Sequence, residues 1–197
     1  IHKEFHLSSA DPNVVGLDKS IPVGYTNFNV ADQLADIGME AIHPKASKPL
    51  EITGINIRIK NTFQPEHPGT LISKDYVSKN HRVEIISGIN KVVAIEIHDP
   101  LMVGEVGFDR DIMEIFQKYK ISYIMKSTNA NSITQVILDE DLNNELSKEL
   151  KNTYHEVTVK PVAIVCALGT NIAEPGVLAK ATQALAKNKI NIESISP

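Results

Sequence analysis

The sequence predicts an α/β protein of the α+β class: part of an α/β sheet, then two tandem βαββαβ modules, the second of them incomplete. Two observations predict this architecture. One pattern, made of an apolar strand, a Gly-bearing loop, an amphipathic helix and a strand that opens on Ile, occurs twice. The residues before position 76 alternate helix and strand signals without this repeat, as expected for the edge of another α/β sheet.

The repeat has a fixed offset, since Gly107 of the first copy corresponds to Gly176, which lies 69 positions later. The other corresponding pairs are Ile95 and Ile164, Phe116 and Leu185, and Ile121 and Ile190. A further strand, helix and strand follow the first copy, whereas the second copy stops at Pro197 before their counterparts. We therefore expect the chain to be the back part of a longer protein.

The composition of the 197 residues is that of an ordinary globular chain, with 42% hydrophobic and 22% charged residues. A net charge of -4 and scattered Lys and Arg argue against a nucleic-acid partner. The longest apolar run, PVAIVCALG, is about half of the roughly 20 residues that a membrane helix needs. The lone Cys166 cannot form an internal disulfide, and we expect it to be a small buried hydrophobe in a protein of the reducing cytoplasm.

The first segment, residues 1–75, opens with an irregular polar stretch and then predicts one short helix. Val30, Leu34 and Ile37 recur at helical spacing, with Asn27 or Asn29 available as N-cap. Gly38 is the expected end of this helix.

Two strands follow in the same segment. Residues 55–60 alternate Ile with polar residues, and a second strand is expected at 70–73. Between them, two prolines and a glycine in NTFQPEHPGT predict a rigid turn in preference to a functional loop. This segment would bury little alone, so we expect it to be part of a larger domain, joined to the repeats by a linker at 76–81.

The first module is expected over residues 82–159. Its opening strand, 82–88, ends at Gly88 and has no counterpart in the repeat unit, so we predict that it pairs with the second module and that the first repeat is inserted into the second. Apolar stripes predict two helices, the first with acidic residues near its N-terminus. The stripes are Ile112, Ile115, Phe116 and Tyr119 in the first helix, and Leu142, Leu146 and Leu150 in the second.

The second module is expected over residues 160–197, with Val177, Ala181 and Leu185 as its helical stripe and Asn188 as the end of the helix. Small helices on one face of a four-stranded antiparallel sheet leave the other face to be covered. We therefore predict a dimer built through these modules.

The loop before the first helix is the main candidate for ligand binding. Gly104 and Gly107 are too closely spaced for a dinucleotide fingerprint, and no Lys follows as in a P-loop. Glycine before a helix instead lets backbone amides approach a carboxylate, such as that of an amino acid, although a purely structural turn is an equal alternative. The candidate residues are Met102, Val103, Gly104, Val106, Gly107 and Phe108, with Ser127, Thr128 and Asn129 on the next strand, and Asn171, Pro175 and Gly176 in the second module.

No metal site is expected, because the seven histidines show no ligand spacing. His43, next to Pro44, has no catalytic partner nearby in sequence, which favours a packed, hydrogen-bonded histidine at a turn.

Residues 38–73 resemble the end of the catalytic domain of the aspartokinases, an amino-acid-kinase family. The residues that carry the resemblance are Gly38, Ile42, His43, Pro44, Asn61, Thr62, Phe63, Pro65, Pro68, Gly69 and Thr70. The repeats resemble ACT domains, which have a ferredoxin-like βαββαβ fold, and EPGVLAKATQALAKNKINIESIS follows the ACT pattern closely. The resemblance covers essentially the whole chain.

The resemblance implies a phosphotransferase that converts ATP and aspartate to aspartyl 4-phosphate, with ATP and Mg as cofactors. SSADPN resembles a nucleotide segment of the family, so Asp11 and Pro12 are candidate ATP contacts, although Asn13 and Glu40 replace the Arg and Lys of many members. The family's N-terminal Lys-x-Gly-Gly and aspartate-binding segments are not in this sequence. We therefore expect no catalytic residue here and no activity from this stretch alone.

The role that the resemblance implies is allosteric sensing, with a feedback amino acid, lysine or threonine, bound at the ACT pair of a homodimer. One alternative is a non-catalytic regulatory subunit whose ACT domains only mediate dimerisation. Another is the kinase half of an aspartokinase fused to homoserine dehydrogenase.

Overall fold

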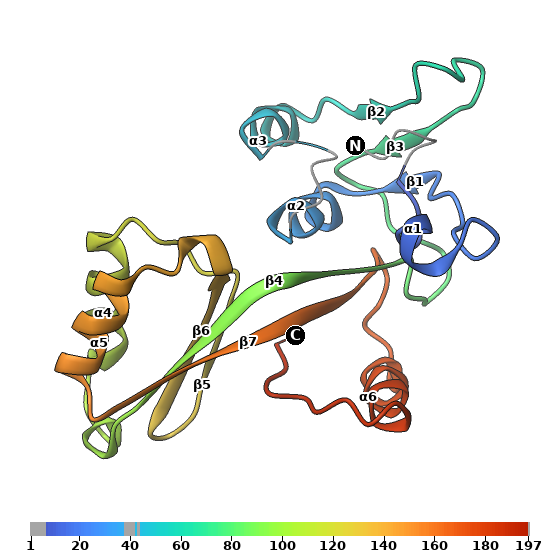
Figure 1. Ribbon diagram of the computed structural model, residues 1–197. Coiled ribbons are helices and arrows are strands. Elements are labelled where there is room, and N and C mark those ends of the chain that lie inside the picture. The colour runs from blue at the N-terminus through green and yellow to red at the C-terminus, as the bar shows by residue number, and fades with distance from the viewer. Residues whose placement is uncertain (1–6, 38–41, 43, 197) are drawn as a thin grey trace. The chain divides into compact units, whose positions relative to one another are not determined.

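The computed structural model describes residues 7–37, 42 and 44–196 (Figure 1). The chain divides into two compact units, one of Ile1–Gly88 with Val165–Asn191, the other of Ile89–Ile164 with Ile192–Pro197. The predictions for Gly38, Glu40 and His43 lie outside the described residues.

The first unit contains a small three-stranded sheet and several helices. In chain order its first elements are α1 (Pro12–Val15), β1 (Tyr25–Thr26), α2 (Phe28–Asp36), α3 (Pro44–Thr53), β2 (Ile57–Ile59) and β3 (Thr70–Ile72). The sheet order is β1-β3-β2, with β1 parallel and β2 antiparallel to the central strand. The sequence predicted neither α1 nor β1, which are too short to show a period.

Helix α2 forms where the apolar spacing predicted it. Asn27 is its N-cap, and the Asn27 side chain accepts a hydrogen bond of 3.0 Å from the Val30 amide. The buried side chains of the helix are Phe28, Val30, Ala31 and Leu34. The prediction of this helix is therefore confirmed.

Helix α3 was not predicted, because Pro49 lies inside it and its apolar residues are few. It is held by a polar contact instead of an apolar stripe. The Ser47 hydroxyl is buried and donates a 2.8 Å hydrogen bond to Asp32 of α2. Tertiary context has overridden a weak local signal.

The loop between β2 and β3 is held by hydrogen bonds and connects the paired strand ends Ile59 and Thr70. Arg58 donates to the Pro68 carbonyl at 2.7 Å, and Asn61 accepts from the Phe63 amide at 2.9 Å. A Cβ on Gly69 would lie 2.0 Å from the Ile59 carbonyl oxygen, so only glycine fits this close approach. These contacts agree with the predicted rigid turn.

The βαββαβ module is formed by strands and helices between residues 85 and 168. They are β4 (Ile85–His98), the 3-10 turn η1 (Pro100–Met102), α4 (Phe108–Lys118), β5 (Met125–Thr128), β6 (Ser132–Leu138), η2 (Asp139–Asp141), α5 (Asn144–Thr153) and β7 (Glu156–Leu168). The sheet order is β5-β6-β4-β7, and β6 pairs antiparallel with both β4 and β5. Figure 1 shows α4 and α5 together on one face of this sheet. The predicted fold class is confirmed.

The core of this module lies between the sheet and the two helices. The Ile112, Phe116, Leu146 and Leu150 side chains of α4 and α5 are fully buried against strand residues such as Ile95. The opposite face of the sheet is also apolar, with a smaller cluster around Val92, Ala94 and Val136. The sequence pattern therefore placed both helical stripes correctly.

The predicted ends of the long strands were wrong. Gly88 does not end a strand, because β4 continues through it to His98. The expected module boundary at 159/160 falls inside the continuous strand β7, which also contains Pro161. Proline is tolerated there because β7 is the last strand of the sheet order.

The second repeat forms its helix, α6 (Val177–Lys187), but no strand after it in the described residues 189–196. The strand expected to open on Ile190 is therefore absent from this structure. None of its side chains is fully buried, and of the predicted stripe Val177 and Leu185 are only partly buried.

The segment before β4 hydrogen-bonds to the second repeat. The Arg82 amide donates to the Asn171 carbonyl at 3.2 Å, and the Glu84 amide donates to the Leu168 carbonyl at 2.8 Å. This is the neighbour that the sequence analysis expected for residues 82–88. That the first repeat is an insertion into the second stays a prediction.

Candidate functional site

The loop between β4 and α4 is fixed at its start by hydrogen bonds, and its two glycines have left-handed conformations. Asp99 is buried, and its carboxylate accepts hydrogen bonds from the Leu101 amide at 2.9 Å and the His155 amide at 3.3 Å. Gly104 and Gly107 have φ angles of 83° and 94°, and a Cβ on either would meet nothing within 4 Å. Glycine is needed here for the backbone conformation, and the N-cap Gly107 gives the first turn of α4 no side-chain hydrogen bond.

Apolar side chains of this loop are exposed. Val106 is 99% exposed and Val103 is 62% exposed, whereas Met102 and Phe108 pack partly against the core. The Phe108 ring lies 5.4 Å from the Tyr154 ring, centroid to centroid. The loop is thus anchored at both ends and presents an apolar surface between them.

The turn after β5 lies next to the start of this loop. The Asp99 amide donates to the Asn131 carbonyl at 3.0 Å, and the Asn129 amide donates to the Ser132 carbonyl at 2.8 Å. The structure therefore brings Asn129 and its turn to the same end of the sheet as the candidate loop. Thr128, the last residue of β5, pairs with Ile133 at this end.

Strand alternation separates Ser127 from its predicted companions. Met125 packs in the cluster on the sheet face away from the helices, whereas Lys126 contacts α4 on the helix face. Ser127 therefore lies on the face of Met125, and Thr128 lies on the face of Lys126.

An ion pair between β5 and α4 was missed by the sequence analysis. Lys126 Nζ lies 2.5 Å from Asp109 Oδ2, and the two side chains are 23% and 47% exposed. Asp109 is in the first turn of α4, where its negative charge also complements the helix dipole. The only sequence signal was one charge of each sign, too weak to pair them.

A buried polar residue lies beneath the same helix. Gln135 of β6 is fully buried and pairs in register with Lys126, and its amide lies 3.3 Å from Met113 Sδ. The Gln135 carbonyl oxygen has no hydrogen-bond partner among the described atoms. The sequence analysis did not single out this residue.

The corresponding loop of the second repeat has the same backbone at its end but different contacts at its start. Gly176 has a φ angle of 98° and precedes α6 as Gly107 precedes α4. Pro175 is exposed. Asn171, in contrast, is engaged, because its side-chain amide donates to the Ser78 carbonyl at 2.9 Å.

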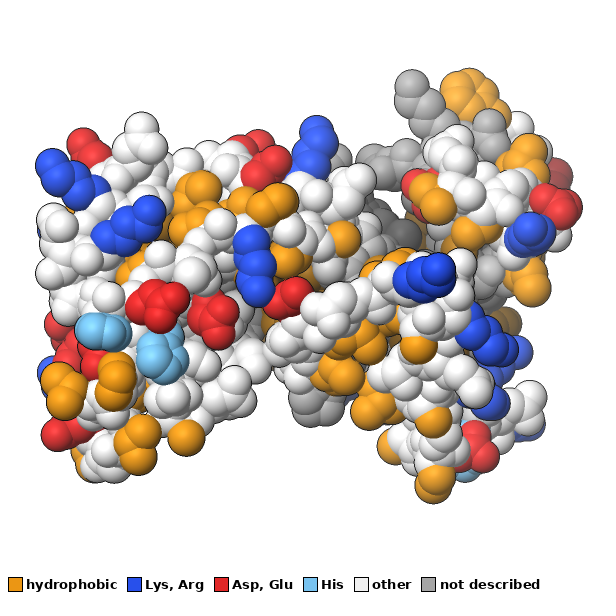
Figure 2. All heavy atoms as spheres, turned by 60° about the horizontal axis from the view of Figure 1, so that its bottom comes forward, with side chains coloured by type: hydrophobic (Ala, Val, Ile, Leu, Met, Phe, Trp, Pro, Cys, Tyr) orange, Lys and Arg blue, Asp and Glu red, His pale blue; other side chains and the backbone are white. Residues whose placement is uncertain are grey.

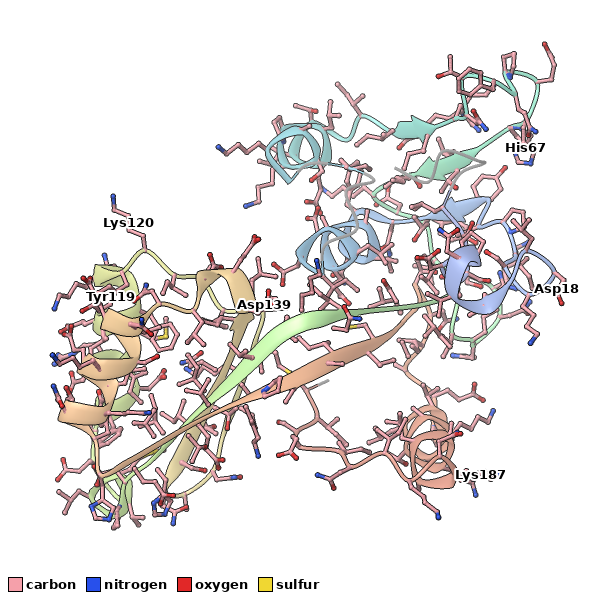
Figure 3. The ribbon with its side chains drawn as sticks, in the orientation of Figure 1. Asp18, His67, Tyr119, Lys120, Asp139 and Lys187 are labelled. Atoms are coloured by element: carbon pink, nitrogen blue, oxygen red, sulfur yellow. The ribbon has the colours of Figure 1, made fainter. Side chains whose placement is uncertain are left out.

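The candidate ATP contacts have local structural roles. Asp11 is the N-cap of α1 and accepts a 2.8 Å hydrogen bond from the Asn13 amide, and Pro12 is at the first position of the helix. The loop that follows α1 carries Asp18 (Figure 3).

A shallow hollow lies at the other end of α4, where Tyr119 is about 18 Å along the helix from Gly107 at about 1.5 Å per residue. Its volume is about 360 Å³, and its lining is Tyr119, Glu145, Lys148, Glu149, Asn152 and Thr153. Lys118 and Tyr119 donate to the Glu149 carboxylate at 2.6 Å and 2.5 Å, and these hydrogen bonds lower the pKa of Glu149. Figure 3 shows Tyr119 and Lys120 at this end of the helix.

The residues that the structure describes do not form other kinds of functional site. No three His, Cys, Asp or Glu side chains there are placed to hold a metal ion. No helix among these residues has the length and apolarity to cross a membrane. Burial raises the pKa of the half-buried Cys166 thiol, which disfavours a reactive thiolate. Figure 2 shows Lys and Arg dispersed over one face of the molecule, not gathered in a stripe.

The chain matches no family model. Aspartate kinase Ask_Ect of Stutzerimonas stutzeri (strain A1501) is 48% identical over 198 residues, covering 99% of this chain and 42% of that relative. The chain thus spans less than half the length of this relative.

Two solved structures extend the comparison. The aspartate kinase of Clostridium acetobutylicum superposes with a TM-score of 0.87 at 29% identity, over 98% of this chain and 46% of that one. Escherichia coli aspartokinase III, in complex with lysine and aspartate, superposes with a TM-score of 0.78 over 98% of this chain and 43% of that one. At 20% identity the second likeness shows the fold alone. Over essentially its whole length, the chain is similar to a part of these aspartate kinases, as the sequence resemblance implied.

Proposed function

We propose that this chain is the amino-acid-sensing region of an aspartate kinase that phosphorylates aspartate with ATP and Mg. The observation that carries the sensing role is the loop before α4, where Gly107 has a left-handed conformation with open space around its Cβ position and gives no side-chain cap to the 11-residue helix. Such a terminus binds carboxylates, because its free N–H groups and the helix dipole both favour negative charge.

The ligand proposed for this loop is an aspartate-family amino acid, lysine or threonine. E. coli aspartokinase III has been solved with lysine and aspartate, which supports lysine as the first ligand to test. The ligand carboxylate would meet the amides that follow Gly107, with Met102, Val103, Gly104, Val106 and Phe108 around it. Thr128 and Asn129, at the same end of the sheet, supply acceptors for the ammonium group.

The test is titration calorimetry on the full-length enzyme with lysine, threonine and methionine, combined with inhibition of aspartyl phosphate formation. Heat and inhibition with the same amino acid support the proposal. A full-length enzyme that is active but neither binds nor is inhibited by any of the three would contradict it.

The catalytic part of the proposal concerns residues outside this chain. Asp11 and Pro12 are the candidates here for ATP contact, and no catalytic residue is proposed. This stretch expressed alone should therefore give no hydroxamate signal above buffer with ATP and aspartate.

A second candidate function is dimerisation without sensing. It is favoured by α6, which has no buried side chain, and by Val165 and Leu178, which are 64% and 56% exposed. A homodimer that covers these residues is part of our proposal as well. Light scattering that shows a dimer, together with calorimetry that shows no amino-acid binding, would favour dimerisation alone.

A cytoplasmic location stays a prediction.

A further inference from the structure

A buried carboxylate joins the linker to the second repeat. The Glu84 side chain is 3% exposed, and its Oε2 accepts hydrogen bonds from the Thr170 amide at 2.8 Å and the Thr170 hydroxyl at 3.0 Å. The guanidinium of Arg82 lies 3.7 Å from Oε1. A buried charge is costly unless it is hydrogen-bonded, so Glu84 keeps Thr170 in place.

The same loop also holds the linker itself. The Thr170 hydroxyl accepts from the Ser78 amide at 2.9 Å, and the Asn171 side chain donates to the Ser78 carbonyl at 2.9 Å. Ser78 is 5% exposed. We call Ser78, Glu84, Thr170 and Asn171 the linker clasp. Each member contacts at least one other, so the loss of one leaves buried polar groups unpaired.

The backbone is close-packed at the clasp. A Cβ on Gly169 would lie 2.6 Å from the Arg82 carbonyl oxygen, so no larger residue fits between the two segments. The Arg82 and Glu84 amides both donate to carbonyls of the loop, at 3.2 Å and 2.8 Å. The two segments therefore share main-chain as well as side-chain hydrogen bonds.

The first repeat has no such contact at the corresponding position. The counterpart of Thr170, 69 positions earlier, is Leu101, which is 76% exposed. The two loops share their glycine-bearing ends but differ where the clasp is built. Only the second loop is tied to the segment that follows the kinase part.

We propose that the linker clasp is a transmission device, which makes residues 78–84 and 168–171 open and close as one unit. The proposal rests on the proposed sensing function. Amino-acid binding changes the regulatory modules, and the clasp passes this change to the linker and hence to the kinase part. A clasp that opens independently of the modules would decouple inhibition from binding.

The physical part is tested by amide hydrogen exchange on the full-length enzyme. Thr170→Val removes the hydroxyl that bridges Glu84 and Ser78, and Thr170→Ser retains it. Thr182→Val is the matched control, because the Thr182 hydroxyl bonds only to carbonyls of its own helix. We expect exchange to become about 5- to 10-fold faster in both segments with Thr170→Val, and to stay unchanged with Thr170→Ser and Thr182→Val. Faster exchange in one segment only would overturn the proposal.

The regulatory part is tested by inhibition with lysine and with threonine. In Thr170→Val we expect the half-inhibitory concentration to rise by about 3- to 10-fold, or the maximal inhibition to fall, while uninhibited turnover stays at the wild-type value. Glu84→Gln is the second variant and should act in the same direction. Unchanged inhibition despite faster exchange in both segments would show a merely structural clasp and overturn the transmission role.

The sensing function and the transmission role of the linker clasp are contradicted by different results. A wild-type enzyme that neither amino acid inhibits would overturn the sensing function and, with it, the transmission role. The exchange measurement would still decide whether the two segments open as one unit.

Discussion

Helices α4 and α6 are two copies of one local structure in two tertiary settings. Each has 11 residues, follows a left-handed glycine, and ends before a lysine with a φ angle of 57°, Lys120 in one copy and Lys189 in the other. The closing hydrogen bonds also match, since the Ile121 and Ile190 amides each donate at 3.0 Å to a carbonyl five residues earlier.

The two helices differ in burial. Helix α4 fully buries Ile112 and Phe116, whereas α6 buries none of its side chains. The corresponding residues of α6 are Ala181 and Leu185. Caps and backbone turns are therefore set by local sequence, and burial is set by what the rest of the chain provides. Four predictions test this difference between the two repeats.

The largest difference should come from truncating the stripe. Phe116→Ala removes a fully buried ring and should lower the free energy of unfolding by about 3–5 kcal/mol. Leu185→Ala, at the corresponding position of α6, should cost less than about 1 kcal/mol, because Leu185 is only partly buried. Urea unfolding followed by circular dichroism measures both. Equal losses would mean that α6 is packed in solution.

The first repeat should also show an alkaline pH dependence that comes from Tyr154. Burial raises the pKa of Tyr154 to about 12, and nearby carboxylates add to the rise. The phenol ionises first in the unfolded chain, so stability is full below pH 10 and falls as the pH rises from about 10 to 12. We expect a loss of about 1–3 kcal/mol over this range. Tyr154→Phe keeps the ring and should remove this part of the loss; an identical alkaline profile in the variant would contradict the assignment.

The two glycines separate the two candidate loops. Gly107→Val and Gly176→Val impose the same left-handed strain, about 1–2 kcal/mol in each repeat. If the loop of the first repeat binds the effector, Gly107→Val alone should raise the half-inhibitory concentration, by about 10-fold or more, because the branched side chain blocks approach to the amides. Inhibition assays on the full-length enzyme decide this. Relief only in Gly176→Val would move the site to Asn171, Pro175 and Gly176.

The smallest effect should be equal in the two copies. Lys120→Gly and Lys189→Gly relieve the same positive φ angle, and each should stabilise by about 0.5–1 kcal/mol after the entropy of glycine in the unfolded chain is subtracted. Thermal unfolding of both variants checks this. A gain in one copy only would show that the two helix ends are not governed by local sequence alone.

The sequence was informative where a signal repeats over several residues. The stripes of α2, α4 and α5 were found from spacing, and Asn27 was one of the two cap residues that the sequence offered. The sequence was misleading where a single residue was taken as the end of a strand. Gly88 was expected to end a strand, but it lies inside β4, because long pairing partners outweigh the local preference of one glycine.

The candidate site was predictable only in part. The glycine loop was recognisable because two glycines precede an amphipathic helix. The pairing of Lys126 with Asp109 and the burial of Gln135 depend on strand register, which no local pattern records. The same is true of Glu84 and Thr170, which are 86 positions apart in sequence.

The position of β7 at the edge of its sheet affects how copies of the protein associate. An unpaired strand edge invites other chains to add to it, and β7 lies at such an edge with its 13 residues. Pro161, near the middle of that edge, has no amide hydrogen, so an incoming strand cannot find a complete ladder of donors. Crowded molecules should therefore be restrained from stacking into fibrils along this strand, while shorter, specific contacts on either side of the proline stay available.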